Sequence, residues 1–370
     1  MPRSPEQRTR EEQQVAFADE YDAMRRALAI AAAPGVPLHP NPRVGCVLLT
    51  PDGEVIAEGF HHGAGTPHAE VEALRAAGDA ARGATAVVTL EPCNHTGRTG
   101  PCSEALIAAG VRRVVIAQRD PNPLAGGGIE TLAAAGIETD AGLLVEDARA
   151  LNPTWTFAHE HGRPFVTWKF ATTLDGRSAA TDGSSRWVSS AAARRDAHVL
   201  RALCDTMLVG SNTVEVDDPH LTVRDADGEL LPSQPLRAVL GNRDLPQSRR
   251  VFDDAATTVQ LRTHDPLEAL RSLYQDHDRQ HVLFEGGPKL AAVFLKAGLV
   301  DEVVTYVAPT LLGSGRSAVG RLGIRSIDKA LRFDLVDSLV LMPASDDPAD
   351  ELINLRLTLR PRVTPNNEEK

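Results

Sequence analysis

Apolar and polar positions along the chain predict two successive α/β units. In the first half, short apolar, β-branched runs such as VGCVLLT (44–50) and TAVVTL (85–90) read as strands. Between them lie segments with helical spacing, such as HAEVEALRAAG (68–78). Strand and helix signals alternate to about residue 150, and this order is typical of an α/β layered domain.

Strand signals resume at PFVTWKF (164–170), and a second series of strands and helices follows. A length of 370 residues also favours two domains. We therefore predict a first domain at 19–150 and a second at 165–362. The remaining segments are predicted to be a disordered extension, a linker and a frayed tail, at 1–18, 151–164 and 363–370 respectively.

Composition narrows the class of protein. No apolar run reaches the ~18 residues of a membrane span, and the charged N-terminus lacks the apolar centre of a signal peptide. A protein of the cytoplasm without a membrane partner is therefore expected. A net charge of −11 disfavours nucleic acid as a partner. Four cysteines do not make a disulfide framework in a chain of this length. In a reducing compartment, paired cysteines more often bind metal or act in catalysis.

Two cysteines lie nine positions apart in TLEPCNHTGRTGPCSEAL (89–106), downstream of an H-x-E triplet that opens a predicted helix. H-x-E followed by P-C and a second cysteine is the signature of zinc deaminases that act on nucleobases. We expect His68, Cys93 and Cys102 to bind Zn²⁺ and to leave its fourth position for a water, whose pKa falls towards ~7. Glu70 is expected to carry protons from that water to the leaving ammonia.

The cysteine pattern also has plainer explanations. The zinc could be structural, with His95 as a fourth ligand, but this would close the water position and leave Glu70 without a role. The spacing is longer than the common P-C-x-x-C, which predicts a loop at the rim of the pocket. On that loop, His95 and Arg98 suit a substrate that carries a phosphate, although Arg98 could instead be a solvated charge. Cys46 and Cys204 read as core residues.

Eight motifs occur in a fixed order: HPNPRVGCVL, PHAEVEAL, TLEPCNHTGRTGPC, ALIAAGVRRVV, DPNP, TLDGRSA, DDPHLTVR and FEGGPKLAAVFL. In this combination the chain resembles the bifunctional riboflavin-biosynthesis deaminase–reductases over about residues 20 to 360. The resemblance implies an N-terminal cytidine-deaminase-like α/β/α layered domain and a C-terminal dihydrofolate-reductase-like α/β domain. It also implies a homo-oligomer, a dimer or a tetramer.

The resemblance implies two reactions. The first is zinc-dependent hydrolytic deamination of 2,5-diamino-6-ribosylamino-4(3H)-pyrimidinone 5′-phosphate. The second is NADPH-dependent reduction of the ribosyl group, which gives 5-amino-6-ribitylamino-uracil 5′-phosphate. Both substrates are small pyrimidine ribose phosphates.

Ligand positions follow from the same resemblance. Asn41 of the HPNP motif is expected to hydrogen-bond the substrate of the first domain. The cofactor positions implied for the second domain are Ala171, Trp187, Thr213, Asp217, Gly287, Pro288, Lys289, Leu290, Ala291 and Ala292. The substrate positions implied there are Ser185, Arg201, Leu221, Arg224 and Glu285.

Without the resemblance, the second half says less. HVLFEGGPKLAAVFL (281–295) reads as strand, turn and helix, and its glycines would let backbone amides approach a phosphate at the helix N-terminus. A plain tight turn is an equal alternative, because G-x-G-x-x-G is absent. Arg201 alone would be an exposed helix charge, and Trp187 could be core. Candidates for the proton donor are Asp217, Lys169 or a water.

Two other functions stay open on the residues alone. A deaminase of tRNA or mononucleotides with an accessory C-terminal domain is one, and the acidic balance and the long cysteine loop argue against tRNA. A zinc-stabilised binding module without catalysis is the other, and Glu70 in its H-x-E context argues against it.

Overall fold

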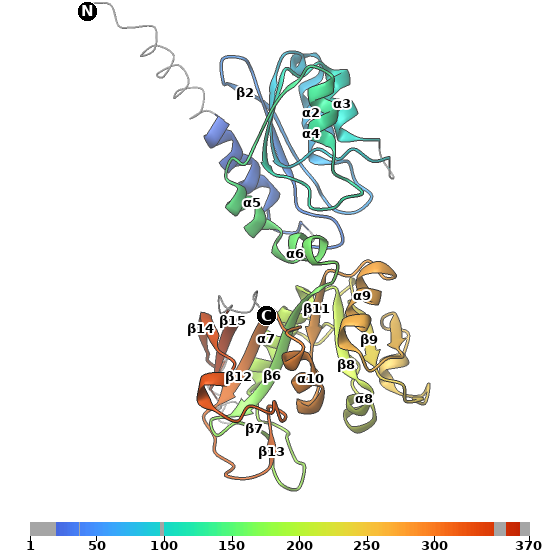
Figure 1. Cartoon of the computed structure of the whole chain (residues 1–370), viewed down its shortest axis with the longest axis vertical. Helices are drawn as coiled ribbons and strands as arrows, with labels where there is room; N and C mark the ends of the chain where they lie inside the picture. The colour runs from blue at the N-terminus through green and yellow to red at the C-terminus, as the bar shows by residue number, and fades with distance from the viewer. Residues whose placement is uncertain (1–19, 37, 97–99, 344–352, 363–370) are drawn as a thin grey trace, which may run out of the picture. The chain divides into compact units, whose positions relative to one another are not determined.

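The structure is a computed structural model that describes residues 20–36, 38–96, 100–343 and 353–362. The chain divides into two compact units, Met1–His161 and Gly162–Lys370. Each unit has its own sheet, flanked by helices (Figure 1). The expected arrangement of two α/β domains is therefore confirmed. The predicted extension and tail lie outside the described residues.

The first unit contains a five-stranded sheet. In this sheet β1 is antiparallel to both of its neighbours, while β3, β4 and β5 run parallel to one another. Across the sheet the strands are β2 (Val55–Phe60), β1 (Gly45–Leu49), β3 (Thr85–Leu90), β4 (Arg113–Gln118) and β5 (Glu138–Ala141).

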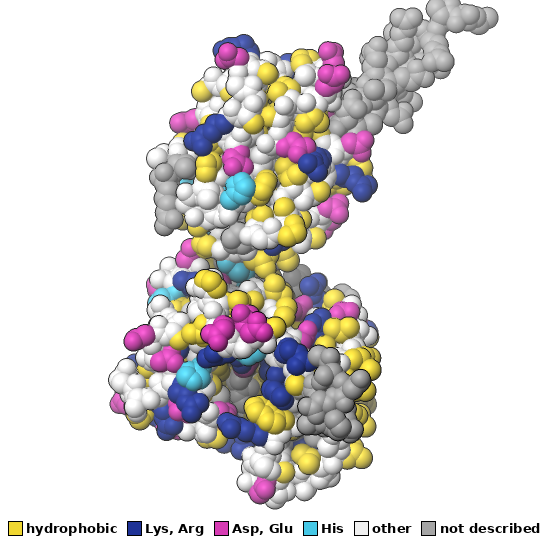
Figure 2. All heavy atoms as spheres, turned by 180° about the vertical axis from the view of Figure 1, so that it is seen from behind, with side chains coloured by type: hydrophobic (Ala, Val, Ile, Leu, Met, Phe, Trp, Pro, Cys, Tyr) yellow, Lys and Arg dark blue, Asp and Glu magenta, His cyan; other side chains and the backbone are white. Residues whose placement is uncertain are grey.

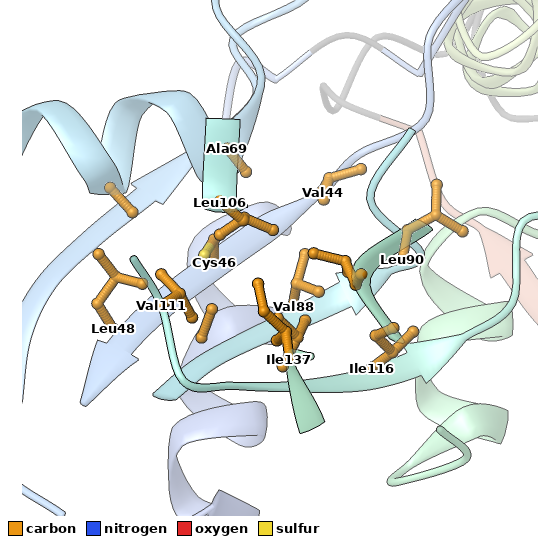
Figure 3. Packing of buried hydrophobic residues seen from close by; sticks show 14 of the residues in the cluster. Val44, Cys46, Leu48, Ala69, Val88, Leu90, Leu106, Val111, Ile116 and Ile137 are labelled. Atoms are coloured by element: carbon orange, nitrogen blue, oxygen red, sulfur yellow. The ribbon is translucent and has the colours of Figure 1, made fainter. Parts of the chain in front are cut away.

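Helices cover both faces of this sheet and make three layers. One face packs against α2 (Ala69–Ala77), α3 (Cys102–Ala109) and α4 (Gly128–Ala134), and Figure 3 shows this part of the core. The other face packs against the helix at 20–31 and against α5 (Val145–Leu151). The strands β1 and β3 are buried throughout, so their apolar runs read as continuous rather than alternating.

The segment 151–164, expected to be a linker, is mostly part of the first unit. It forms α6 (Pro153–His161), which begins with proline, a residue favoured at the first position of a helix. Trp155 of α6 is buried in the core of the first unit. The burial of this aromatic side chain explains why the segment is ordered rather than extended.

The second unit contains an eight-stranded sheet. The strands from β10 to β12 are parallel, whereas β15 is antiparallel to β12 and β14. Across the sheet they are β10 (Thr258–Leu261), β9 (Leu236–Leu240), β8 (Thr206–Gly210), β11 (His281–Phe284), β6 (Phe165–Thr173), β12 (Glu302–Ala308), β15 (Asn354–Pro361) and β14 (Phe333–Leu341). A separate small sheet pairs β7 (Arg177–Ala179) with β13 (Arg316–Ser317).

Alternate residues of the central strands face opposite layers. In β11, Val282 and Phe284 pack towards α9 (Pro266–Gln275) and α10 (Pro288–Lys296). Leu283 faces the other side, where α7 (Ala191–Ala202) and α8 (Ser211–Asp217) lie. This period of two places two apolar layers on one sheet. Among the described residues, no helix is long and apolar enough to cross a membrane.

Candidate active sites

Three side chains of the H-x-E and cysteine motifs meet at the ends of two helices in the first unit. His68 is the residue that precedes α2, and Cys102 is the first residue of α3. Cys93 lies in the loop that leaves β3. Both helix N-termini carry partial positive charge, which stabilises thiolates at this position.

The geometry of these three residues fits a zinc ion. Nδ1 of His68 lies 3.2 Å from Sγ of Cys102 and 3.5 Å from Sγ of Cys93, and the three ligand atoms all lie within 4.8 Å of one another. Tetrahedral zinc bonds of normal length separate a nitrogen and a sulfur ligand by about 3.6 Å. The two thiols share one proton: hydrogen bonding from Cys102 lowers the pKa of the Cys93 thiol to about 4, and the same bond raises the pKa of the Cys102 thiol.

Glu70 follows the histidine on the first turn of α2 and is 3% exposed. Burial raises the pKa of its carboxyl to about 7. A carboxyl whose pKa is close to neutrality can both accept and release a proton at physiological pH. Its position beside the three ligands suits the expected proton shuttle.

A histidine that the sequence did not single out also lies at this site. His61 follows β2 and is buried, and its ring packs edge-on against that of His68 at 5.3 Å between centroids. Its Nδ1 is 3.0 Å from the carbonyl oxygen of Pro67, so Nδ1 carries the proton. Its Nε2 then accepts from Nδ2 of Asn41 at 3.0 Å, which fixes the orientation of the Asn41 amide. A second histidine seven residues before His68 was the available signal.

Glu91 anchors the loop that carries Cys93 through hydrogen bonds. Its buried carboxylate accepts hydrogen bonds from the backbone N–H groups of Gly127, Ile129 and Asp120, at 3.1 Å in each case. These bonds connect the loop that carries Cys93 to the start of α4. They therefore limit the movement of Cys93, a predicted zinc ligand. Glu91 was not predicted as a functional residue, because a carboxylate next to P-C has no signature of its own.

The rim loop between the cysteines is only partly described. His95 is exposed there, which is compatible with contact to a substrate but not with a fourth buried ligand. Arg98 lies outside the described residues.

In the second unit, the chain reverses its direction across the sheet between β8 and β11. From β8 it passes through α8 to β9 on one side, and from β11 it passes through α10 to β12 on the other. In open α/β sheets, ligands bind at the carboxyl ends of the strands beside such a switch point. Gly210 and Glu285 stand at those two ends.

Two predicted substrate residues pair with each other at this place. The guanidinium of Arg201, on α7, donates two hydrogen bonds to the carboxylate of Glu285, at 2.9 and 2.8 Å. Burial alone would raise the pKa of Glu285, but Arg201 and Lys169 outweigh it and hold the pKa at about 2. Lys169 of β6 is half-buried in the same cluster, and desolvation lowers its pKa. Both residues remain predicted substrate positions, and their ion pair fixes the orientation of the two side chains.

The loop that carries Leu221 and Arg224 joins this cluster. Arg201 also donates to the carbonyl oxygen of Thr222 at 3.3 Å, and the backbone N–H of Arg224 donates to Nδ1 of His198 on α7 at 3.3 Å. Leu221 is buried with a left-handed backbone (φ +53°). Figure 2 shows Lys and Arg side chains gathered around a hollow on this unit.

The N-terminus of α10 offers backbone donors, but over a shorter stretch than expected. Gly287 precedes the helix. The first helical hydrogen bond runs from the backbone N–H of Ala291 to the carbonyl oxygen of Gly287. The backbone N–H groups of Lys289 and Leu290 lie before this first bond in the chain. They can therefore donate hydrogen bonds to a phosphate. Ala291 and Ala292 are buried in the core, which leaves their side chains no access to a ligand.

The other predicted positions of the second unit are more dispersed. Trp187 and Ser185 lie in an exposed loop before α7, and the Trp187 ring stacks with the guanidinium of Arg194 at 4.3 Å. Thr213 is on α8, and Asp217 is exposed at its end. The half-buried Ala171 on β6 lies two residues from Lys169, on the same face of the sheet.

Comparison with known families agrees with the division into two units. Residues 18–118 match the zinc-binding region of cytidine and deoxycytidylate deaminases, and residues 164–344 match the RibD C-terminal domain. The fold and the sites thus define a zinc-binding deaminase joined to a reductase.

Relatives of this type align over most of the chain. The chain is 52% identical over 305 residues to riboflavin biosynthesis protein RibD of Mycobacterium tuberculosis (strain ATCC 25618 / H37Rv), covering 81% of this chain and 89% of that protein. It is 42% identical over 348 residues to RibD of Escherichia coli (strain K12), covering 85% and 94%. It therefore belongs to the RibD family of bifunctional riboflavin-biosynthesis deaminase–reductases.

Solved structures give the same result. Acinetobacter baumannii RibD superimposes with a TM-score of 0.82 at 37% identity, over 94% of this chain and 100% of that chain. A Thermotoga maritima diaminohydroxyphosphoribosylaminopyrimidine deaminase/5-amino-6-(5-phosphoribosylamino)uracil reductase superimposes with a TM-score of 0.75 at 33% identity, over 93% and 99%. The family predicted from the ordered motifs is confirmed, as are its two activities and the zinc-binding character of the deaminase domain.

Proposed function

We propose that the first unit deaminates 2,5-diamino-6-ribosylamino-4(3H)-pyrimidinone 5′-phosphate, and that the second reduces the ribosyl group of the product with NADPH. The observation that carries the proposal is the convergence of His68, Cys93 and Cys102 beside the buried Glu70. The name of the Thermotoga maritima relative, which specifies both substrates, supports the choice of substrate.

In the deaminase unit, His68, Cys93 and Cys102 would hold the zinc ion. When bound, the ion acts as a Lewis acid that lowers the pKa of a water. Glu70 takes a proton from the water as it attacks the carbon that carries the amino group, and passes a proton to the departing ammonia. Asn41, held by His61, orients the pyrimidine for this attack.

In the reductase unit, the first turn of α10 and the switch point between β8 and β11 would hold NADPH. When bound, the cofactor supplies the hydride that reduces the opened ribosyl group. Arg224 is assigned to the substrate phosphate, because only one of its guanidinium nitrogens has a described partner, the Gly228 carbonyl oxygen. Lys169 is assigned as the proton donor, because it lies in the half-buried cluster with Glu285, whereas Asp217 is exposed.

The proposal extends to the setting of the protein. We assign the chain to the cytoplasm as a homo-oligomer that acts on small molecules. The net charge of −11 favours such substrates over nucleic acid.

The test assays the two reactions separately in a Glu70→Gln variant. Ammonia release should fall by about 10²–10⁴-fold, because the general base is lost. Zinc should stay bound, and NADPH should still reduce supplied deaminated intermediate near the wild-type rate. NADH should reduce it less efficiently, and equal kcat/KM values for the two cofactors would contradict the choice of NADPH.

Glu72→Gln is the matched control, since Glu72 lies on the same helix turn and contacts the Phe60 N–H and His62 rather than the zinc ligands. Loss of reduction in Glu70→Gln, with zinc content and Tm unchanged, would refute two separate sites.

A further inference from the structure

His198 is a half-buried histidine on α7, beside the proposed reductase site. It precedes Arg201 by three positions, so both side chains project from one face of the helix. That face contacts the backbone of residues 222–224 in the loop after α8. The contact therefore joins α7 to the segment whose Arg224 is proposed to bind the substrate phosphate.

Two side chains of α7 bind this backbone in opposite senses. Arg201 donates from Nη1 to the carbonyl oxygen of Thr222 at 3.3 Å. His198 accepts at Nδ1 from the backbone N–H of Arg224, also at 3.3 Å. A guanidinium has donors and no acceptor, so Arg201 cannot take over the bond that His198 makes.

The bond to Arg224 also fixes the protonation of the imidazole ring. A backbone N–H donates and has no lone pair to offer, so Nδ1 of His198 must be unprotonated. The ring is then neutral, with its proton on Nε2. Protonation of Nδ1 would set two N–H donors against each other and break the bond.

Charged groups from four parts of the second unit face His198. Arg201 lies on its own helix, Lys169 on β6, Arg224 on the loop after α8 and Glu285 after β11. Of these four groups, only Glu285 is an anion, and Arg201 already binds both of its oxygens. Burial and the charge of Arg201 lower the pKa of His198 below its usual 6.5. The ring is therefore neutral near pH 7 and becomes charged only in acid.

We propose that His198 is a positioning residue of the reductase, which holds Arg224 in place for the substrate phosphate while its ring is neutral and releases it when the ring is protonated. This role rests on the proposed function, in which Arg224 binds that phosphate. It adds a dependence on pH to the binding of the substrate.

The loop after α8 is ordered within itself by Gln234. Its side-chain amide accepts from the backbone N–H of Val223 and donates to the carbonyl oxygen of Val223, at 2.8 Å in both bonds. His198 and Arg201 attach this ordered loop to α7. Loss of the His198 bond should therefore loosen the placement of Arg224 without unfolding the loop.

Steady-state kinetics of the full chain at neutral pH test the role of His198. Deaminated intermediate is supplied at varied concentration with saturating NADPH. In His198→Ala, KM for the intermediate should rise about 5-fold, as expected for the loss of one hydrogen bond. The value of kcat should change by less than about 2-fold, because the lost bond affects binding rather than the chemical step.

His198→Asn is the conservative variant. The asparagine Oδ1 can accept from the backbone N–H of Arg224 as Nδ1 does, and the amide does not titrate. At neutral pH its KM should stay near the wild-type value. An equal rise of KM in His198→Asn and in His198→Ala would overturn the proposal, because the acceptor would then have no effect.

The pH profile separates positioning from a purely structural role. From about pH 7 to about pH 5, KM of the wild type should rise by a larger factor than KM of His198→Asn. The substrate phosphate also titrates near pH ~6, but it does so equally in both assays. The ratio of the two KM values therefore reports on His198 alone, and a ratio that stays constant with pH would overturn the proposal. This comparison decides by itself if His198→Ala does not fold.

His277→Asn is the matched control. It removes another half-buried histidine, on the turn after α9, and α9 covers the opposite face of the sheet from α7. Its KM should follow that of the wild type at every pH. A profile altered as in His198→Asn would show that any histidine of this unit suffices, which contradicts a specific role for His198.

Calorimetric titration with ribose 5-phosphate, without NADPH, gives a measurement that needs no turnover. The Kd should rise in His198→Ala and stay near the wild-type value in His198→Asn. A wild type that does not reduce the intermediate would refute the proposed function. An active wild type together with unchanged KM and Kd in His198→Ala would instead overturn the role of His198 alone.

Discussion

Arg201 donates to both carboxylate oxygens of Glu285, with Nε to Oε1 at 2.9 Å and Nη2 to Oε2 at 2.8 Å, across 84 positions of sequence. One residue comes from α7 and the other from the end of β11. The pair therefore fastens the helix layer to the switch point of the sheet, where the reductase site is proposed.

Glu285→Gln should destabilise the second unit. The substitution leaves the Arg201 charge buried without its counterion, at a cost of about 2–3 kcal/mol in the free energy of unfolding. Urea unfolding of the two proteins measures it. Asp244→Asn breaks an exposed pair with Arg262 and serves as the control, with an expected loss below about 1 kcal/mol. Equal losses in the two variants would contradict a buried, tightly held pair.

The same pair predicts a pH dependence. The pKa of Glu285 falls from 4.5 to about 2 on folding, so its contribution to stability is complete above about pH 5 and is lost as the pH falls towards 2. The stability difference between wild type and Glu285→Gln should thus be largest near neutrality and shrink with acidification. Urea unfolding curves of both proteins, recorded from pH 7 downwards, measure this difference in the free energy of unfolding. A difference that grew towards acid pH would contradict the prediction.

A Cys93→Ala/Cys102→Ala double variant should lose its zinc. Two of three ligands are removed, and a single histidine does not retain the ion. Metal analysis should show about one zinc per chain in the wild type and almost none in the variant. A Cys46→Ala/Cys204→Ala variant, which removes the other two buried thiols, should keep its zinc. Zinc retained in the first variant would place the metal elsewhere.

Asn41 and His61 should act as one unit in deamination. His61→Ala frees the Asn41 amide, so the double variant Asn41→Ala/His61→Ala should lose less than the sum of the two single losses. The expected coupling is about 1 kcal/mol, typical of one hydrogen bond. Values of kcat/KM for ammonia release in the four proteins give it, while zinc content should stay constant. Strictly additive losses would mean that the bond has no role in the reaction.

Two adjacent glycines should respond differently to alanine. A Cβ at Gly286 would lie 2.0 Å from the ring of Phe284, which is buried and stacked on Phe294. Gly286→Ala should therefore cost about 1–3 kcal/mol of stability, as overpacking does. A Cβ at Gly287 meets nothing within 4 Å, so Gly287→Ala should keep its stability. Its methyl group at the start of α10 should instead raise the Kd for NADPH, measured by fluorescence titration.

The zinc site could be predicted from the sequence because its residues lie in short, recognisable motifs. His68 and Glu70 are two residues apart, and thiolates with an imidazole form a donor set that few other functions need. His61 could not be found this way, since its role depends on β2 ending beside α2. The brace from Glu91 depends equally on α4 returning to the cysteine loop.

The site of the second unit was harder to predict from the sequence, because its residues come from segments that lie far apart in the chain. The pairing of Arg201 with Glu285 requires the strand order, which no local pattern contains. The strand β14 was not predicted from the sequence. Its sequence, FDLVDSLVL, does not alternate strictly between apolar and polar residues, so the period of two that marks a half-buried strand is absent.

The helix α6 decides where the gene can be divided. A cut after residue 150 would remove Trp155 from the core of the first unit and expose to water the apolar residues that Trp155 covers. A cut between His161 and Gly162 respects both sets of contacts. Two half-proteins expressed from that position would each keep the contacts of their own unit, so each reaction could be assayed on its own half.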